Sequence, residues 1–368
     1  MVEEDKTKDN DNHYMKLALE LARKGEGMTS PNPIVGAVIV KDGKIIGRGY
    51  HKKAAMPHAE VEAMHSVKDK KLLKGSTLYV NLEPCDHYGR TGPCTRAIIN
   101  AGIGRVVAAM KDPNPKVDGK GFEELKNAGV EVKWGVMEQE AKKLNEAFAK
   151  FKTQQKPFVI LKAAMSADGK IATRAGQSKW ISSEESRSYV HELRNKVDAV
   201  IVGINTVLHD NPSLTCRLPR GRDPLRVILD SKLRIPLDAR IFSDQNTIIA
   251  TTNHCDKDKI RKLEEKGVGV IVTRDGNEKV NLKDLLYELA LRSMTHIMVE
   301  GGSEVAASFL KEKLVDKVVY FIAPKIIGGR DAKTPVGGKG IENMEEALEL
   351  KDIEIKKIGK DVVIEAYL

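Results

Sequence analysis

The stretch from Pro57 to Cys94 constrains this 368-residue chain more than any other part of its sequence. It holds His58 and two cysteines, Cys85 and Cys94, and each of these three residues directly follows a proline. One imidazole and two thiolates supply three zinc ligands, and a catalytic zinc ion keeps its fourth position for water. Glu60 follows His58 by two residues at a helix start, so its carboxylate can reach that water without being a ligand. The stretch therefore predicts a catalytic zinc site.

The order of these residues is similar to the His-x-Glu…Pro-Cys…Cys pattern of zinc deaminases, in which the glutamate moves protons and zinc activates water. The spacing differs from the usual one. Eight residues, 86–93, separate the two cysteines, where nucleoside and nucleic-acid deaminases usually have two. These eight include His87, Arg90 and Thr91, which this interpretation places beside the metal. Because a proline precedes Cys94, we expect it to open a helix, where the positive potential favours a thiolate.

Two other interpretations of this stretch are a structural zinc site and a pair of buried free thiols. A structural zinc normally needs four protein ligands, so His51 or His87 would have to complete it. The catalytic interpretation is favoured because a histidine, a glutamate, a Pro-Cys pair and a second cysteine occur in this order between two helix starts.

The composition is that of an ordinary soluble globular protein. The chain is long enough for two domains, and its net charge of +9 comes from interleaved basic and acidic residues, without a basic arm. Such a balance suits an anionic small substrate at least as well as a nucleic acid, and aromatic residues, at 5%, do not suggest base-stacking platforms. The four cysteines imply no disulfide framework. Residues 1–12 are polar, and no run of 18 apolar residues occurs, so we expect a cytoplasmic protein without a membrane partner.

The clearest break in the chain is at residues 154–157, Gln-Gln-Lys-Pro, and predicts domains at 1–153 and 154–368. In the first domain we expect a disordered tail of about a dozen residues before a helix at 13–24. A hairpin turning at Asp42-Gly43 should follow. The remaining elements predicted here are the helices opened by His58 and Cys94, strands at 77–82, 105–110 and 130–136, and helices near 122–127 and at 138–152.

The second domain alternates strands and helices, which predicts a mainly parallel sheet covered on both faces. Ligands of such sheets bind at the carboxyl ends of the strands. Three strand exits are rich in polar residues or glycine: 162–171, 202–215 and 296–303, the last with Gly301-Gly302 opening a helix. A glycine turn before a helix can approach a phosphate, although a tight turn without a ligand is an equally good interpretation of this motif alone.

The combined motifs closely resemble the bifunctional deaminase–reductase family of riboflavin biosynthesis, from about His13 to the end of the chain. The strings that carry this resemblance are residues 83–94 (Glu-Pro-Cys-Asp-His-Tyr-Gly-Arg-Thr-Gly-Pro-Cys), 162–172 and 299–302 (Val-Glu-Gly-Gly). The resemblance implies an α/β fold, with an N-terminal cytidine-deaminase-like α/β/α sandwich and a C-terminal dihydrofolate-reductase-like α/β domain.

The resemblance also implies two reactions. The first domain would remove the 2-amino group of 2,5-diamino-6-(5-phosphoribosylamino)pyrimidin-4(3H)-one as ammonia. The second would use NADPH to reduce the ribosyl group of the product, 5-amino-6-(5-phosphoribosylamino)uracil, to a ribityl chain. A homo-oligomer, dimer or tetramer, assembled through the reductase domains is also implied.

Transferred position by position, the family's site residues fall into four groups. The zinc ligands are His58, Cys85 and Cys94, and the proton shuttle is Glu60. The substrate contacts in the deaminase domain are Asn32, His51, His87 and Arg90. The substrate contacts in the reductase domain are Lys162, Ser178, Arg194, Leu214, Arg217 and Glu300. The contacts to NADPH are Ala164, Trp180, Thr206, Asp210, Ser231, Gly301 and Gly302.

Several alternatives stay open at this point. Trp180 and Leu214 could be core residues, and Arg194 could be a helix-surface charge. Residues 91–93 and Ala167 differ from the family's common pattern, but neither difference touches a proposed ligand. An editing deaminase that acts on tRNA or single-stranded DNA is opposed by the cysteine spacing and the second domain. A non-catalytic zinc scaffold is disfavoured because it has no use for Glu60.

Overall fold

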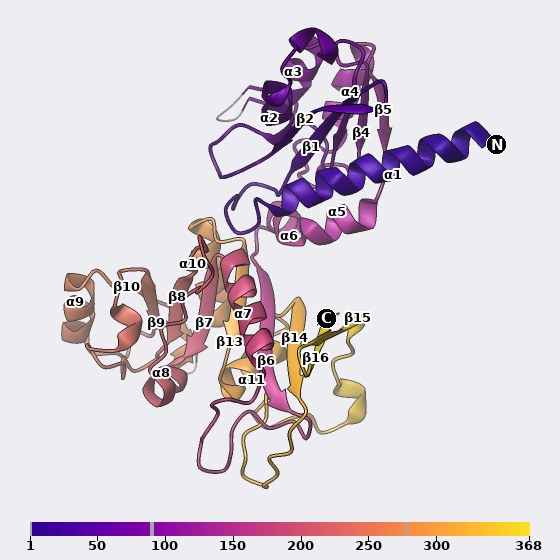
Figure 1. Cartoon of the computed structure of the whole chain (residues 1–368). Coiled ribbons are helices and arrows are strands. Elements are labelled where there is room, and N and C mark those ends of the chain that lie inside the picture. The colour runs from indigo at the N-terminus through magenta and orange to yellow at the C-terminus, as the bar shows by residue number, and fades with distance from the viewer. Residues whose placement is uncertain (1, 89–91, 277) are drawn as a thin grey trace. The chain divides into compact units, whose positions relative to one another are not determined.

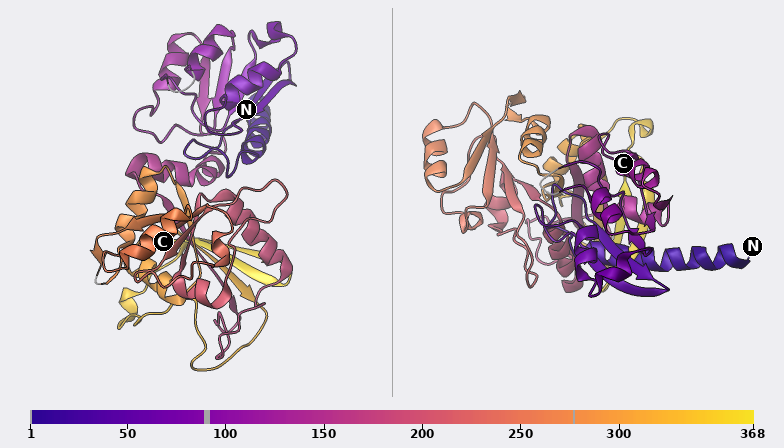
Figure 2. Two further views of the ribbon diagram at one scale, coloured as in Figure 1. Left: turned by 90° about the vertical axis from the view of Figure 1, so that its left-hand side faces the viewer. Right: turned by 90° about the horizontal axis from the view of Figure 1, so that it is seen from above.

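The structure is a computed structural model that describes all residues except 1, 89–91 and 277, with only the backbone of residues 2–9, 275 and 276. The chain forms two compact units, Met1–Gln155 and Lys156–Leu368 (Figure 1, Figure 2). Each unit holds its own large sheet with helices packed on it. Along the described chain, no helix combines the length and the apolar character needed to cross a membrane.

The first unit is built on a five-stranded sheet in the order β2-β1-β3-β4-β5. Strand β1 pairs antiparallel with β2 and β3, whereas β3, β4 and β5 are parallel. The β1–β2 hairpin turns at Asp42 and Gly43, both with positive φ, as the sequence predicts. The strands are β1 Gly36–Lys41, β2 Lys44–Tyr50, β3 Thr77–Val80, β4 Arg105–Ala108 and β5 Glu131–Trp134.

Helices cover both faces of this sheet. The helices are α1 Val2–Arg23, α2 Ala59–Ser66, η1 Lys70–Leu73, α3 Cys94–Asn100, α4 Lys120–Asn127, α5 Glu138–Leu144 and α6 Glu146–Gln154. A Cβ on Gly36 would meet the backbone of α1, and a Cβ on Gly49 would meet the backbone of α2. Gly49 is paired with Ala37, whose side chain points to the face opposite to that of Gly36. Helices α1 and α2 therefore lie on opposite faces of the sheet (Figure 1).

Two expectations for the first unit are wrong. The predicted disordered tail is part of α1, which begins at Val2. Long-range contacts hold this helix, because the buried Asp11 accepts hydrogen bonds from Tyr79, Arg105 and Lys133. In place of the single helix expected at 138–152, the structure has two helices, α5 and α6, which meet at Asn145. The break occurs there because the side chain of Asn145 forms hydrogen bonds with the backbone N–H and C=O of Ile34.

The second unit is built on a nine-stranded sheet in the order β10-β9-β8-β7-β13-β6-β14-β16-β15. All neighbours are parallel except β14–β16 and β15–β16, so the prediction of a mainly parallel sheet is confirmed. The strands are β6 Phe158–Ser166, β7 Ala199–Gly203, β8 Leu225–Leu229, β9 Thr247–Thr251, β10 Gly269–Val272, β13 His296–Glu300, β14 Lys317–Ala323, β15 Lys351–Ile358 and β16 Asp361–Tyr367. A separate small ribbon consists of β11 Asp275–Gly276 and β12 Lys279–Val280.

Helices also cover both faces of the second sheet. The helices are α7 Glu184–Lys196, α8 Ile204–Asp210, η2 Arg240–Phe242, α9 Lys257–Glu265, α10 Leu282–Leu291, α11 Ser303–Lys311 and η3 Met344–Glu346. Helices α10 and α11 share a buried apolar cluster with Leu161 of β6. Helix α7 lies on the opposite face, where its Tyr189 contacts Phe321 of β14. Phe321 points to the same side as Val319, which is paired with Lys162, and Lys162 points away from the side of its neighbour Leu161. Sequence analysis missed the hairpin β15–β16 and the short helix α8, which it treated as a polar strand exit.

Candidate active sites

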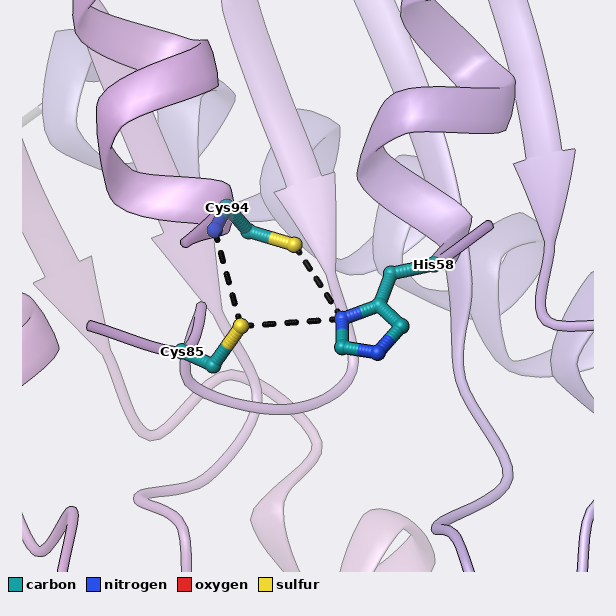
Figure 3. Close-up of side chains that lie close together, drawn as sticks. All are labelled: His58, Cys85 and Cys94. Atoms are coloured by element: carbon teal, nitrogen blue, oxygen red, sulfur yellow. Dashed lines mark hydrogen bonds between the residues drawn. The ribbon is translucent and has the colours of Figure 1, made fainter. Parts of the chain in front are cut away.

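Three side chains from separate segments converge in the first unit (Figure 3). His58 is the residue that precedes α2, Cys94 is the first residue of α3, and Cys85 lies in the loop that follows β3. The Nδ1 atom of His58 lies 3.3 Å from Sγ of Cys94 and 3.6 Å from Sγ of Cys85. The backbone N–H of Cys94 also donates to Sγ of Cys85 at 3.5 Å. One nitrogen and two sulfurs thus point at a common position.

This arrangement fits a tetrahedral zinc ion. With Zn–S bonds of about 2.3 Å and Zn–N bonds of about 2.0 Å, neighbouring ligand atoms of a tetrahedron lie about 3.6 Å apart. Within the described part of the chain, no fourth histidine, cysteine or acidic side chain joins the cluster of His58, Cys85 and Cys94. A zinc ion bound by these three residues therefore keeps a free corner, as in catalytic rather than structural zinc sites.

The thiols of Cys85 and Cys94 shift each other's pKa in opposite directions. Hydrogen bonds from the Cys94 thiol, the His58 ring and the Cys94 backbone lower the pKa of Cys85 to about 4, although burial opposes the shift. The same shared proton raises the pKa of Cys94. A bound dication removes this asymmetry, because it stabilises both thiolates directly. The pair is therefore suited to metal binding.

Glu60 lies in the first turn of α2, next to the ligand His58. Its side chain is only 4% exposed. Burial raises the pKa of its carboxyl group, the nearby charge of His58 lowers it, and the charge of Cys85 raises it again, with a net increase. A carboxylate with a raised pKa accepts a proton more readily at neutral pH, which is the property that a proton shuttle needs.

His51 and Asn32 lie beside this metal site. The ring centroids of His51 and His58 are 5.4 Å apart. Nδ1 of His51 lies 3.1 Å from the carbonyl of Pro57, so it donates there, and Nε2 then accepts from the Asn32 amide at 3.2 Å. Burial lowers the pKa of His51, which keeps its ring neutral. Among the described residues, none donates a hydrogen bond to the amide oxygen of Asn32, so this oxygen can accept one from a ligand.

The other two predicted deaminase contacts follow Cys85 in the same loop. His87 is exposed, and its Nδ1 lies 3.5 Å from a carboxylate oxygen of Asp86. Arg90 lies outside the described residues. Both therefore stay predictions.

Glu83 is a buried residue to which sequence analysis assigned no role, although it lies in the motif that ends in Cys85. Its carboxylate accepts hydrogen bonds from four backbone N–H groups, at 2.9–3.3 Å, those of Asp112, Gly119, Gly121 and Phe122. A Cβ on Gly121 would lie 2.1 Å from the carbonyl of Pro84, so the segment packs tightly against the cysteine loop. Glu83 therefore supports the loop that carries Cys85.

The second unit contains a cavity of about 1860 Å³ along the carboxyl ends of its parallel strands. All of the predicted reductase residues lie in its lining: Lys162, Ala164, Ser178, Trp180, Arg194, Thr206, Asp210, Leu214, Arg217, Ser231, Glu300, Gly301 and Gly302. Gly301 and Gly302 have φ values of 109° and 80°, which side chains disfavour. The turn they form opens α11 beside Thr206 of α8, which suits a bound phosphate.

An ion cluster forms at the end of β13. Strand pairing places Glu300 opposite Lys162, whose Nζ lies 3.4 Å from the carboxylate. Arg194 of α7 binds both carboxylate oxygens, at 2.8 and 3.0 Å. Although burial alone would raise it, Arg194 and Lys162 hold the pKa of Glu300 at about 2. Two cations and one anion leave net positive charge in the cavity, which favours an anionic ligand.

The structure also decides three of the open alternatives. Trp180 is 60% exposed, so it is not a core residue, and the guanidinium of Arg187 lies 4.6 Å from its ring centroid. Arg194 is not a surface charge, because its side chain is only 12% exposed. Leu214 is 5% exposed and packs like a core residue while it lines the cavity.

The cavity lining also contains polar residues that sequence analysis missed. Examples are Arg187, His191, Lys279, Lys283 and Lys333. Arg187 lies about two turns and His191 about one turn before Arg194 on the same helix, and this spacing is the only sequence signal that could have indicated them.

Comparison with known families and proteins agrees with both sites. The cytidine and deoxycytidylate deaminase zinc-binding region matches residues 8–110, and the RibD C-terminal domain matches residues 157–364. The riboflavin biosynthesis protein RibD of Aquifex aeolicus is 49% identical over 355 residues, which cover 96% of this chain and 97% of that protein. The protein of the same name from Escherichia coli is 39% identical and is covered to 98%.

Solved structures give the same result for the fold. The RibD structure of Acinetobacter baumannii (form 2) has a TM-score of 0.86 at 36% identity and covers 98% of this chain and 99% of that chain. The diaminohydroxyphosphoribosylaminopyrimidine deaminase/5-amino-6-(5-phosphoribosylamino)uracil reductase of Thermotoga maritima has a TM-score of 0.86 at 40% identity, with the same coverage. The predicted pair of α/β folds, cytidine-deaminase-like and then dihydrofolate-reductase-like, is confirmed.

Proposed function

This chain belongs to the RibD family of riboflavin biosynthesis, whose members join a deaminase and a reductase, and from that premise we propose which residues carry each reaction. The protein is a bifunctional enzyme that uses zinc in the first reaction and NADPH in the second. It hydrolyses the 2-amino group of 2,5-diamino-6-(5-phosphoribosylamino)pyrimidin-4(3H)-one. It then reduces the ribosyl group of 5-amino-6-(5-phosphoribosylamino)uracil to ribityl. We assign these activities to domains 1–153 and 154–368.

In the deaminase domain, His58, Cys85 and Cys94 hold the metal. The zinc ion supplies Lewis-acid activation of a water molecule at neutral pH. Glu60 is placed to act as the proton acceptor there: it would take a proton on a carboxylate oxygen from the water molecule whose oxygen attacks C2 of the pyrimidine. Glu60 then donates the proton to the departing amino group, which leaves as ammonia. The raised pKa of Glu60 supports both transfers.

Asn32, His51, His87 and Arg90 are the proposed substrate contacts around this metal. The neutral ring of His51 fixes the Asn32 amide, so its free oxygen can accept a hydrogen bond from a substrate N–H group. Arg90 suits a phosphate, because a guanidinium binds phosphate oxygens in pairs.

In the reductase domain, the ion cluster of Lys162, Arg194 and Glu300 is the proposed centre of the substrate site. Ser178, Leu214 and Arg217 complete the wall around the phosphoribosyl group. NADPH supplies the hydride. Its proposed contacts are Ala164, Trp180, Thr206, Asp210, Ser231, Gly301 and Gly302.

The observation that carries the deaminase assignment is the three-ligand cluster at 3.3–3.6 Å beside the buried Glu60. A Glu60→Gln variant tests it, because the amide cannot accept a proton but preserves the shape of the side chain. We expect the variant to keep its zinc, measured by elemental analysis, and to release ammonia at least about a thousandfold more slowly. It should still oxidise NADPH with supplied deaminated substrate. Unchanged ammonia release would reject the role of Glu60.

We also propose a homo-oligomer, a dimer or tetramer, assembled through the reductase unit. Strand β15 ends the nine-stranded sheet and exposes Ile353 at 56% and Ile355 at 69%. An exposed apolar edge strand is a surface that a second subunit commonly covers. A double variant, Ile353→Lys with Ile355→Lys, should therefore reduce the mass measured by light scattering, and an unchanged mass would exclude this edge. The expected place of action is the cytoplasm, where zinc-binding thiols stay reduced.

A further inference from the structure

Two lysines line the end of the reductase cavity that lies away from Glu300. Lys279 belongs to β12 and Lys283 to the first turn of α10. Both side chains are exposed, and among the described residues neither ammonium group has an ion-pair or hydrogen-bond partner. Two unpaired cations at one end of a nucleotide-sized cavity suggest an anionic part of the ligand.

Ser231 lies at the same end of the cavity. Its hydroxyl oxygen accepts a hydrogen bond from the backbone N–H of Val280 at 3.2 Å. Its carbonyl accepts from the hydroxyl groups of Thr251 and Thr252, at 3.3 and 3.0 Å. These bonds join the exits of β8 and β9 to the β11–β12 ribbon. Since Val280 directly follows Lys279, Ser231 and the two lysines border one corner of the cavity.

The strand order sets the distance between this corner and the glycine turn. Gly301 and Gly302 follow β13, Ser231 follows β8, and only β7 lies between those two strands. Neighbouring strands are about 4.8 Å apart, so the two exits are separated by about 10 Å. A dinucleotide whose diphosphate lies at the start of α11 can therefore extend its adenosine half to Ser231.

We propose that Lys279 and Lys283 bind the 2′-phosphate of NADPH and thereby make the reductase prefer NADPH to NADH. NADH is identical except for this phosphate, so cations at the adenosine end are the groups that distinguish the two. The inference rests on the proposed assignment of the cavity to NADPH. Each ammonium–phosphate contact should contribute roughly a tenfold difference in affinity.

Arg234 is the competing cation near this corner. Its guanidinium donates to the side-chain oxygen of Asn205 at 2.9 Å, and Asn205 lines the cavity from α8. The lysines are the better candidates because they line the cavity themselves and keep all their donors available. The experiment must still separate the two possibilities.

The test is calorimetric binding of adenosine 2′,5′-bisphosphate and of 5′-AMP to the zinc-loaded full chain, without turnover. Three proteins are compared: the wild type, Lys279→Ser with Lys283→Ser, and Lys262→Ser as a matched control. Lys262 is an exposed lysine of α9 outside the cavity lining. We expect the double variant to bind the bisphosphate about a hundredfold more weakly and 5′-AMP within about twofold of the wild type. The control should match the wild type for both.

Two results would overturn the inference while leaving the reductase assignment intact. One is a double variant that keeps the wild-type preference for the bisphosphate. The other is loss of that preference in Arg234→Ser alone. Equal weakening of both nucleotides in the double variant would also reject it, because that result indicates a damaged cavity. If the wild type bound neither nucleotide and did not oxidise NADPH, the cavity assignment itself would be wrong.

Discussion

The metal site of the first unit and the cavity of the second unit are assembled in different ways. The metal ligands come from a stretch of 37 residues, His58 to Cys94, and their donor atoms lie within 4.8 Å of one another. The cavity lining runs from Leu161 to Pro335 and is collected by the edge of a parallel sheet. Short metal–ligand bonds require a compact set of side chains, whereas a dinucleotide contacts many strand exits. A short motif therefore indicates the first site, and topology is needed for the second.

The two sites also shift the pKa of a glutamate in opposite directions. Burial raises the pKa of Glu60, and the main opposing influence among the described residues is the charge of His58 rather than a lysine or arginine. The side chain of Glu300 is only 11% exposed, but Arg194 and Lys162 hold its pKa at about 2. The same residue type is thus prepared to exchange protons in one site and to stay ionised in the other. This difference indicates that Glu60 takes part in chemistry and that Glu300 positions two cations.

The largest effect is expected from removing a metal ligand. Cys94→Ser replaces a thiolate with a hydroxyl group that binds zinc weakly, so zinc should be lost and ammonia release should fall about ten-thousandfold. NADPH oxidation with deaminated substrate should stay within about twofold. Cys255→Ser, which changes a cysteine far from the cluster in sequence, is the control. Deamination that survived zinc loss would contradict the metal's role.

The next effect concerns the pH dependence of stability. Glu300 has an ordinary pKa of 4.5 and a folded-state pKa of about 2, so its carboxylate stabilises the fold above pH 4.5. This contribution, about 3 kcal/mol, should be lost as the pH falls from about 4.5 to 2. Urea unfolding of the wild type and of Glu300→Gln at pH 7 and pH 3 measures it. The variant should lack this part of the pH slope, and identical slopes would show that Glu300 is not held ionised.

A smaller effect is expected at Glu83, which supports the cysteine loop. Glu83→Gln replaces two charged acceptor oxygens with one carbonyl oxygen, so about 2 kcal/mol of unfolding free energy should be lost. Zinc affinity should fall about tenfold, because Glu83 positions the loop of a ligand. Glu131→Gln, at an exposed carboxylate of β5, is the matched control. If the Glu83→Gln variant kept its stability and its zinc affinity, Glu83 would not be needed to hold the cysteine loop in place.

The smallest effect is expected at Asn145. Asn145→Ala removes the two hydrogen bonds to the backbone of Ile34, and the unfolding free energy should fall by about 1–2 kcal/mol. Both activities should be retained, measured as ammonia release and NADPH oxidation. A stable, unchanged variant would mean that the break between α5 and α6 has another cause.

The sequence predicted the parts of the fold that local patterns determine. The Asp42-Gly43 turn and the alternation of strands and helices in the second half follow from backbone preferences and hydrophobic periodicity. The errors lie where distant residues decide the structure. The polar residues before His13 form a helix because Asp11 meets Tyr79 and Arg105, and the helix expected at 138–152 is interrupted because Asn145 meets Ile34.

The candidate sites were predictable to different degrees. The metal cluster could be derived from residue types and spacing alone, but the support from Glu83 depends on hydrogen bonds to the backbone of residues 112–122, and no local pattern indicates that this segment meets Glu83. The ion cluster of Glu300 requires the pairing of β13 with β6, which the sequence does not encode locally. The reductase residues were therefore predicted through family resemblance. Lys279 and Lys283 were not predicted as ligand contacts because the sequence contains no clear signal for the β11–β12 ribbon.

The measurement that tests the central claim most directly compares Glu60→Gln with Glu300→Gln in the same two assays. Ammonia release is followed with the diaminopyrimidine substrate, and NADPH oxidation with the deaminated intermediate. Two separate sites predict reciprocal results: Glu60→Gln loses only ammonia release, and Glu300→Gln loses only NADPH oxidation. If either single variant abolished both activities while it stayed folded and zinc-loaded, the assignment of one reaction to each unit would be contradicted.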